Sequence, residues 1–440
     1  MTAQERKTAL ANLQNSEITR PAMTGIQIMY HGERKTFDAY NIPLDYLVYN
    51  KYNGRIGSVV KSFERQNHTL DPECEEDIKI IENFLMESKK DANIKTRKSL
   101  LEEHQQKYGI VTAEGIIIDG NRRASLLNSL RRDESISPNI KQHCNYFLAI
   151  ILPVDADRRE ILRLETTYQM GEDAKVDYNP IEKYLKCKDL LDEGFSREEI
   201  ATFMGETKSN GEPNTTMIDM YLGVLKLMDE YLQNYHYDGM YTLLDKNEDS
   251  FQKLHSALKG YTSGSVASMW DFDPEIDTND LKLIAFDYIR SGFDQTDFRN
   301  IITKPSAGNP NRSFFGCQDI WTSFRDYHFE HIDPITDAEE SVDEIISNAN
   351  GADVTRLLRA RDNAWQKKAL GLMTGNYNRS KDKLDNKQAA DNPLKLLQKA
   401  LDVLESVDTE QPSFKNDANV KECVKEISSL IWEYKKMLER

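Results

Sequence analysis

The sequence predicts an α+β protein whose C-terminal half is entirely helical. Two observations support this class. Between residues 41 and 175, short β-branched apolar runs alternate with segments of helical periodicity, as expected for a sheet domain. From residue 176 onward, apolar residues recur at helical spacing. With 440 residues, 39% of them hydrophobic, the chain is long enough for two or three domains with buried cores.

Residues 1–40 are expected to form an N-terminal extension. A helical segment at 8–15 is followed by a β-rich stretch at 25–40, which suits a hairpin with its turn at His31-Gly32.

Residues 41–175 form the predicted sheet domain. The runs LDYLV, GIIID and NYFLAIILPV are typical of strands. A charged helical insertion at 74–109 separates the first two runs, and a further helix is predicted at 155–168. The insertion carries one apolar stripe, formed by Ile78, Ile80, Ile81, Phe84 and Leu85.

The segment GIIIDGNRRASLLNSL, residues 115–130, carries the main chemical signal. Its order is a buried strand, a tight turn and a helix. Gly120 allows a ligand to approach the backbone, the first N–H groups of the helix favour an anion, and Arg122 and Arg123 add two guanidinium groups. This arrangement predicts a phosphate site. The alternative is an ordinary strand-to-helix turn with solvated arginines.

Three further segments follow a fixed order around this turn, at residues 42–58, 164–205 and 215–232. Together with the turn they resemble the ParB family of partition proteins, whose N-terminal domain shares its fold with sulfiredoxin. The resemblance covers roughly residues 40 to 235, about half of the chain. It implies a ParB/sulfiredoxin-like domain that binds a nucleoside triphosphate and Mg²⁺, followed by a helix-turn-helix.

The resemblance also implies roles for individual residues. Residues 50–55 match the family's first box, with Asn53 where the family has a glutamine linked to hydrolysis. Glu165 matches the cation-binding glutamate, while Thr166 and Gln169 replace the asparagine and arginine expected beside it. Asn53 and Glu165 are therefore the catalytic candidates, and Glu165 is the metal candidate. The nucleotide-binding candidates are Asn50, Arg55, Asp119, Gly120, Asn121, Arg122 and Arg123.

Residues 176–240 predict the helix-turn-helix region. A helix begins at Asn179-Pro180, a capping box at Ser196 and Glu199 starts a short second helix, and Thr215 is expected to cap the third. The turn at 206–214 is longer than usual, and the third helix begins without Arg, Lys, Gln or Asn to contact bases. A degenerate three-helix core is therefore an alternative to a DNA reader. The DNA-binding candidates are Lys208, Ser209, Asn210, Thr215 and Thr216.

The remaining sequence predicts helices without recognisable chemistry. Residues 241–335 form a helical domain of unknown role, and His328 and His331 lack the spacing of a helical metal pair, so we interpret them as structural. Residues 336–440 form a C-terminal helical region with a polar linker expected at 374–392. Amphipathic helices at 393–407 and 420–438 are expected to bury their apolar faces against each other or against a second copy of the chain.

Charge and composition limit the possible partners. The net charge of −16 disfavours binding of the whole chain to DNA, so DNA contact requires a local basic face. The candidates for such a face are Arg122, Arg123, Arg131 and Arg132. Arg131 and Arg132 also suit the C-terminal end of a helix. No window contains the roughly 18 consecutive apolar residues of a membrane span and no secretory signal is present, so a cytoplasmic protein is expected. The five cysteines form no CxxC pair.

The leading functional hypothesis is a ParB-like, DNA-associated protein in which a bound triphosphate, CTP or ATP, controls the grip of a homodimer on DNA. The first alternative is an NTPase or small-molecule kinase of a mobile-element or phage-defence system, with Asp119 or Glu165 as base or metal ligand. The second is an interaction protein with a vestigial nucleotide pocket.

Overall fold

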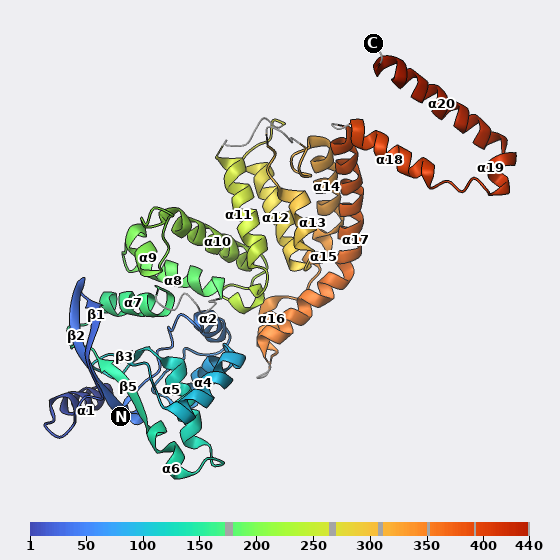
Figure 1. Ribbon diagram of the computed structural model, residues 1–440. Coiled ribbons are helices and arrows are strands. Elements are labelled where there is room, and N and C mark those ends of the chain that lie inside the picture. The colour runs from blue at the N-terminus through green and yellow to red at the C-terminus, as the bar shows by residue number, and fades with distance from the viewer. Residues whose placement is uncertain (172–178, 264–269, 307–310, 350–352, 391–392, 439–440) are drawn as a thin grey trace.

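The computed structural model describes residues 1–171, 179–263, 270–306, 311–349, 353–390 and 393–438. It confirms the α+β class. A small mixed sheet lies near the N-terminus, helices cover it, and the rest of the described chain is helical (Figure 1).

The sheet has five strands in the order β1-β2-β5-β3-β4, and only the β3–β5 pair is parallel. β1 and β2 form the predicted hairpin, in which His31 and Gly32 make the turn with φ of 49° and 78°. The strands are β1 Met23–Tyr30, β2 Glu33–Pro43, β3 Gly109–Val111, β4 Ile117–Asp119 and β5 Tyr146–Ile151.

The prediction of a strand at residues 44–48 is wrong. Leu44–Tyr46 is a single 3-10 turn, and only Val48 makes an isolated bridge, to Ile116. A strand with one buried face requires apolar residues at every second position, and the apolar residues at 44, 47 and 48 do not have this spacing. Leu44 is buried in the core. The strand β3 was not predicted, since three residues are too short to show a period.

Helices pack on both faces of the sheet. Along β5, Phe147, Ala149 and Ile151 face the core shared with α3, α4 and α5, while Leu148 and Ile150 face α7. This alternation is the two-residue period of a strand buried on both sides. The helices of this region are α1 Ala3–Asn15, α2 Gly57–Gln66, α3 Glu75–Glu87, α4 Lys90–Glu103, α5 Asn121–Arg132, α6 Pro138–Lys141 and α7 Arg158–Thr166.

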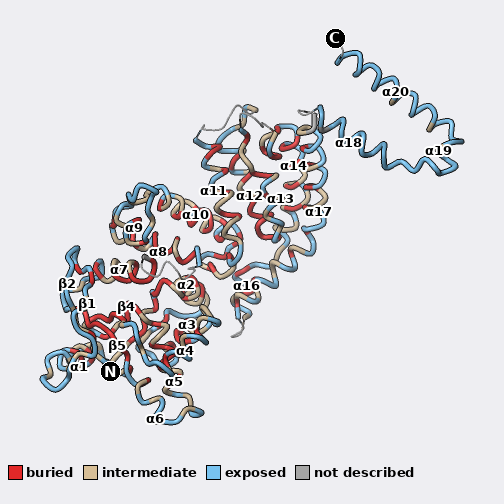
Figure 2. Tube along the Cα trace, in the orientation of Figure 1, coloured by how far each residue is buried: buried red, intermediate tan, exposed pale blue. Residues whose placement is uncertain are grey.

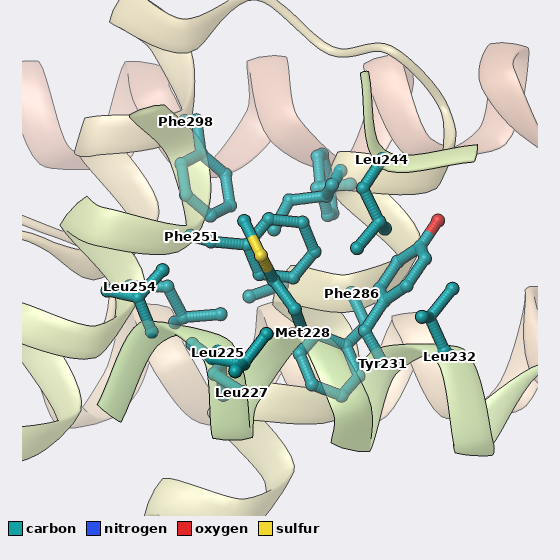
Figure 3. Packing of buried hydrophobic residues seen from close by; sticks show 14 of the residues in the cluster. Leu225, Leu227, Met228, Tyr231, Leu232, Leu244, Phe251, Leu254, Phe286 and Phe298 are labelled. Atoms are coloured by element: carbon teal, nitrogen blue, oxygen red, sulfur yellow. The ribbon is translucent and has the colours of Figure 1, made fainter. Parts of the chain in front are cut away.

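The remaining helices build a second, larger core. Among the described residues, its members lie between Met170 and Leu384, on both sides of residue 240. Figure 3 shows aromatic and aliphatic side chains of this core packed between neighbouring helices, with Phe251, Phe286 and Tyr231 in contact. The helices are α8 Pro180–Asp192, α9 Arg197–Phe203, α10 Thr215–Asn234, α11 Glu248–Thr262, α12 Ile276–Arg290, α13 Gln295–Ile302, α14 Gln318–His331, α15 Asp333–Asp337, α16 Val342–Ser347 and α17 Val354–Ala390.

The predicted polar linker at 374–392 is wrong for its described part. Residues 374–390 belong to the 37-residue helix α17. Asn376, Tyr377, Ser380 and Leu384 are buried on one face, which continues the stripe begun by Trp365, Ala369 and Met373. A polar sequence forms a packed helix here because only one narrow face has to be buried.

The chain ends in a projecting arm (Figure 1), made of α18 Pro393–Glu405, α19 Pro412–Asn416 and α20 Ala418–Leu438. Figure 2 shows this arm exposed along its length. The apolar faces of α18 and α20 are not buried against each other, since Leu401 is 53% and Trp432 58% exposed. Across the described residues, every helix is too short or too polar to cross a membrane.

Candidate phosphate site at the β4–α5 turn

The predicted phosphate turn is a strand, a single left-handed glycine and a helix. Gly120 has φ of 101° and forms the N-cap of α5, with no side chain capping the helix. A Cβ at this position would lie 2.6 Å from Cζ of Phe147 and 3.2 Å from a guanidinium nitrogen of Arg123. Both the backbone conformation and the space therefore require glycine. The start of α5 is left without a capping side chain, as an anion site needs.

Asn121 joins this turn to the loop at 50–56. Its buried side chain donates to the carbonyl of Ile117 at 2.8 Å and accepts from the backbone N–H of Asn50 at 2.9 Å. The two segments that resemble the first and second family boxes are therefore held side by side. Asn121 is structural in this position, because both its amide N and its O contact backbone groups.

Arg123 is bound within the protein. It forms an ion pair with Asp119 at 2.7 Å and donates to the carbonyls of Lys107 and Tyr108. These contacts of Arg123 stabilise the turn, and they occupy the carboxylate of Asp119. Arg122, one residue earlier, is half-buried on the first turn of α5.

Asn53 and Arg55 lie in the loop that faces this turn. Asn53 is buried, and its side-chain oxygen accepts from the backbone N–H of Arg55 at 3.0 Å. This contact is an Asx-type turn, a local backbone role.

Glu165, the cation candidate, is buried against a lysine. Its carboxylate lies 2.8 Å from Nζ of Lys186 and accepts from the N–H of Gly54 at 3.3 Å. Burial raises the pKa of Glu165, and the ammonium of Lys186 opposes the shift. The Lys186 ammonium is therefore the cation that Glu165 pairs with in this structure.

Two polar side chains lie next to this ion pair, and the role of one of them, Glu182, was not predicted from the sequence. Glu182 at the start of α8 is buried, accepts from the N–H and Oγ of Ser58 at 2.9 and 2.5 Å, and has its pKa raised to about 7 by burial. Gln169 donates to the carbonyl of Ile118, while its side-chain oxygen has no hydrogen-bond partner in the described chain. The signal available for Glu182 was its place in the first turn of the helix predicted to begin at Asn179-Pro180.

A small cavity lies between α8, the loop at 50–56 and α2. Gly54, Glu182 and Lys186 line it, and its volume is about 30 Å³. This is room for a water molecule rather than a nucleotide.

The helix-turn-helix region has the predicted helices with one shift. The capping box at Ser196 and Glu199 is confirmed, as are the helix starts at Pro180 and Arg197. Thr215 is the first helical residue rather than the cap, because Asn214 caps α10 by accepting from the N–H of Met217.

The DNA candidates lie on an exposed turn. Thr207 and Pro213 form a bridge that closes the turn into a small loop, and Lys208, Ser209 and Asn210 are exposed on it. Lys208 lies 3.6 Å from Glu212, so one acidic group screens its charge. Thr216 is exposed and Thr215 half-buried.

Comparisons with models of protein families, with curated proteins and with solved structures found no match. The resemblance to ParB proteins therefore stays a prediction from the motifs.

Proposed function

We propose that this protein is a nucleotide-binding, DNA-associated protein of the ParB type, which holds a triphosphate at the start of α5. The observation that carries the proposal is the open N-terminus of α5. Gly120 brings the backbone close, no side chain caps the helix, and Arg122 lies on its first turn. The nucleotide is CTP or ATP. The turn does not distinguish between them, because it would contact the phosphates and not the base.

The ion pair of Glu165 shapes the proposed role of the metal. Lys186 already neutralises the carboxylate, so Mg²⁺ enters with the triphosphate and does not need Glu165 as a ligand. Glu165 becomes a Mg²⁺ ligand only when Lys186 moves away.

A second candidate is an interaction protein with a vestigial nucleotide pocket. The contacts of Arg123 favour it, because this guanidinium is already bound to Asp119 and two carbonyls. An NTPase or kinase needs Asp119 or Glu165 as a base or metal ligand, and both are engaged in ion pairs.

The test is isothermal titration of the full chain with each of the four ribonucleoside triphosphates, with and without Mg²⁺. We expect micromolar binding of at least one of them. Arg122→Ala should weaken it by about tenfold or more, because it removes a charged hydrogen bond worth about 1.5–3 kcal/mol. Arg131→Ala is the matched control, as it removes the same charge from the far end of α5.

The outcomes separate the candidates. Equal affinity in Arg122→Ala and Arg131→Ala, or no binding at all, would overturn the phosphate site and leave the interaction protein. Binding to mixed-sequence DNA that weakens steeply with added salt would support the DNA role. Nucleotide turnover without DNA would support the enzyme instead.

A further inference from the structure

Three side chains from neighbouring helices meet inside the larger core, far from the β4–α5 turn. Asp287 lies on α12, His328 on α14 and Asp333 at the start of α15 (Figure 1). One nitrogen or oxygen from each lies within 4.8 Å of the other two. Imidazole and carboxylate are the ligands with which proteins bind divalent transition metals.

Asp287 and His328 are already oriented toward each other. Nε2 of His328 lies 2.9 Å from Oδ2 of Asp287, and both residues are buried. The hydroxyl of Tyr235 donates to the other oxygen of Asp287 at 2.8 Å. This is the outer contact that typically fixes a metal-binding carboxylate in position.

The hydrogen bonding of the cluster is incomplete. Nδ1 of His328 is buried and has no hydrogen-bond partner in the described chain, although the ring is fully enclosed. Asp333 is half-buried, and none of the described residues donates a hydrogen bond to its carboxylate or pairs with it. Buried polar groups without partners are uncommon and call for an explanation, such as an ion.

The charge around Asp333 is also unbalanced. Three of the side chains with the strongest electrostatic influence on Asp333 are the carboxylates Asp287, Asp337 and Asp280, and the fourth is His328. Arg325 is engaged with Asp277, Asp280 and Asp326, and Arg290 with Glu339 and Asp362. A divalent cation would offset this negative charge.

We propose that Asp287, His328 and Asp333 form a binding site for one divalent transition-metal ion of the Zn²⁺ or Mn²⁺ class. The imidazole favours these ions over Mg²⁺ and Ca²⁺, which take oxygen ligands. Ligand atoms bonded to such an ion at about 2.0–2.2 Å lie roughly 3.3 Å apart, so a small movement closes the site. Asp333 is placed to make this movement, because it is the first residue of a five-residue helix and is partly exposed. Water completes the coordination, and the ion ties α12 to α14 and α15.

The experiment uses the full chain, without an affinity tag and stripped with EDTA. Zn²⁺ is titrated in competition with a chromogenic chelator, and Co²⁺ is titrated while visible absorbance is recorded. We expect one equivalent of each to bind and Co²⁺ to give absorption bands typical of nitrogen and oxygen ligands. Asp333→Asn should weaken Zn²⁺ binding by about tenfold or more, because amide oxygen is a poor ligand for this ion.

Asp337→Asn is the matched control. It removes the same charge from the same helix at a residue outside the set of three, so it should bind Zn²⁺ as the unchanged protein does. Circular dichroism of both variants confirms folding. Substoichiometric Zn²⁺ in the unchanged protein, or equal affinity in the Asp333→Asn and Asp337→Asn variants, would overturn the proposal.

A melting experiment provides a second, independent readout. Zn²⁺ should raise the melting temperature of the unchanged protein and of Asp337→Asn, since a ligand of the folded state stabilises it. Asp333→Asn should lose this increase. An increase of equal size in Asp333→Asn would show that Zn²⁺ binds elsewhere on the chain.

Discussion

At the scale of single residues, Gly120 decides the geometry of the candidate phosphate site. Its left-handed backbone turns the chain from β4 into α5, and Phe147 and Arg123 occupy the space that a side chain would need. Any other residue here would suffer both left-handed backbone strain and steric overlap of its Cβ with Phe147 and Arg123. The requirement for glycine is therefore stricter than at an exposed turn.

Gly120→Ala should therefore destabilise the protein by about 2–4 kcal/mol, combining left-handed strain with overpacking. The measurement is the shift of thermal and urea unfolding midpoints. Gly25→Ala is the matched control, because Gly25 has φ of 75° with nothing within 4 Å of its Cβ position. That variant should lose only about 1 kcal/mol. Similar losses in both variants would show that the Phe147 ring moves aside for the added methyl group without lowering the stability further.

Glu182 is the residue whose titration should be visible in stability. Its pKa is raised to about 7 in the folded protein, against 4.5 as the ordinary value. A raised carboxyl pKa means that the folded state holds the proton more tightly. Its contribution to stability is therefore full below about pH 4.5, falls as the pH rises to about 7, and stays low above that.

Between pH 5 and pH 8, this titration should cost the unchanged protein about 2–3 kcal/mol of unfolding free energy. Glu182→Gln keeps the acceptor for Ser58 and should remove that part of the pH dependence. The measurement is urea unfolding at both pH values. Glu198→Gln, an exposed change of the same kind, should keep the original dependence. If Glu182→Gln also kept it, the assigned pKa would be wrong.

At the scale of elements, the pair of Glu165 and Lys186 joins α7 to α8 across the boundary between the sheet domain and the helical region. Both side chains are at most 2% exposed. Removing either partner leaves a buried charge without its counterion, which costs more than the pair itself contributes.

Glu165→Gln and Lys186→Met should each destabilise the fold by about 3–5 kcal/mol. The double variant should lose less than the sum of the two, because it leaves no buried charge and the glutamine oxygen still accepts from Gly54. Unfolding midpoints of the four proteins complete a double-mutant cycle. Additive losses would indicate that the two charges do not stabilise each other.

At the scale of the whole molecule, the arm formed by α18 and α20 leaves its apolar faces exposed in the part of the chain that the structure describes. Its exposed apolar side chains include Leu397, Leu401, Ile431 and Trp432. The homodimer expected from the sequence would bury these two amphipathic faces, because a second copy presents the same faces.

Light scattering after gel filtration should give the mass of a dimer for the full chain. Leu401→Asp should yield monomer, since it places a charge on the apolar face of α18. Gln398→Asp introduces the same group on the same helix in place of a polar residue and should remain dimeric. A monomeric unchanged protein, or a dimeric Leu401→Asp, would contradict the dimer.

The α+β class, the hairpin, β4 with its turn, β5 and the caps at Asn179 and Ser196 followed from the sequence. Each depends on neighbouring residues, through a two- or four-residue period or a side chain that contacts its own backbone. Local rules therefore predicted the elements. They failed at residues 44–48 and in α17, where the pattern was too short or too polar to identify one buried face.

What the sequence by itself determined is the order of these elements and the presence of Gly120, Arg122 and Arg123 at a strand-to-helix turn. Only the tertiary structure decided which charged side chains meet, near this turn and elsewhere in the fold. Lys186 lies 21 residues from Glu165 and Asp333 lies 46 residues from Asp287, yet each pair comes together through packing. Contacts between distant residues are set by how helices pack, which no local period encodes.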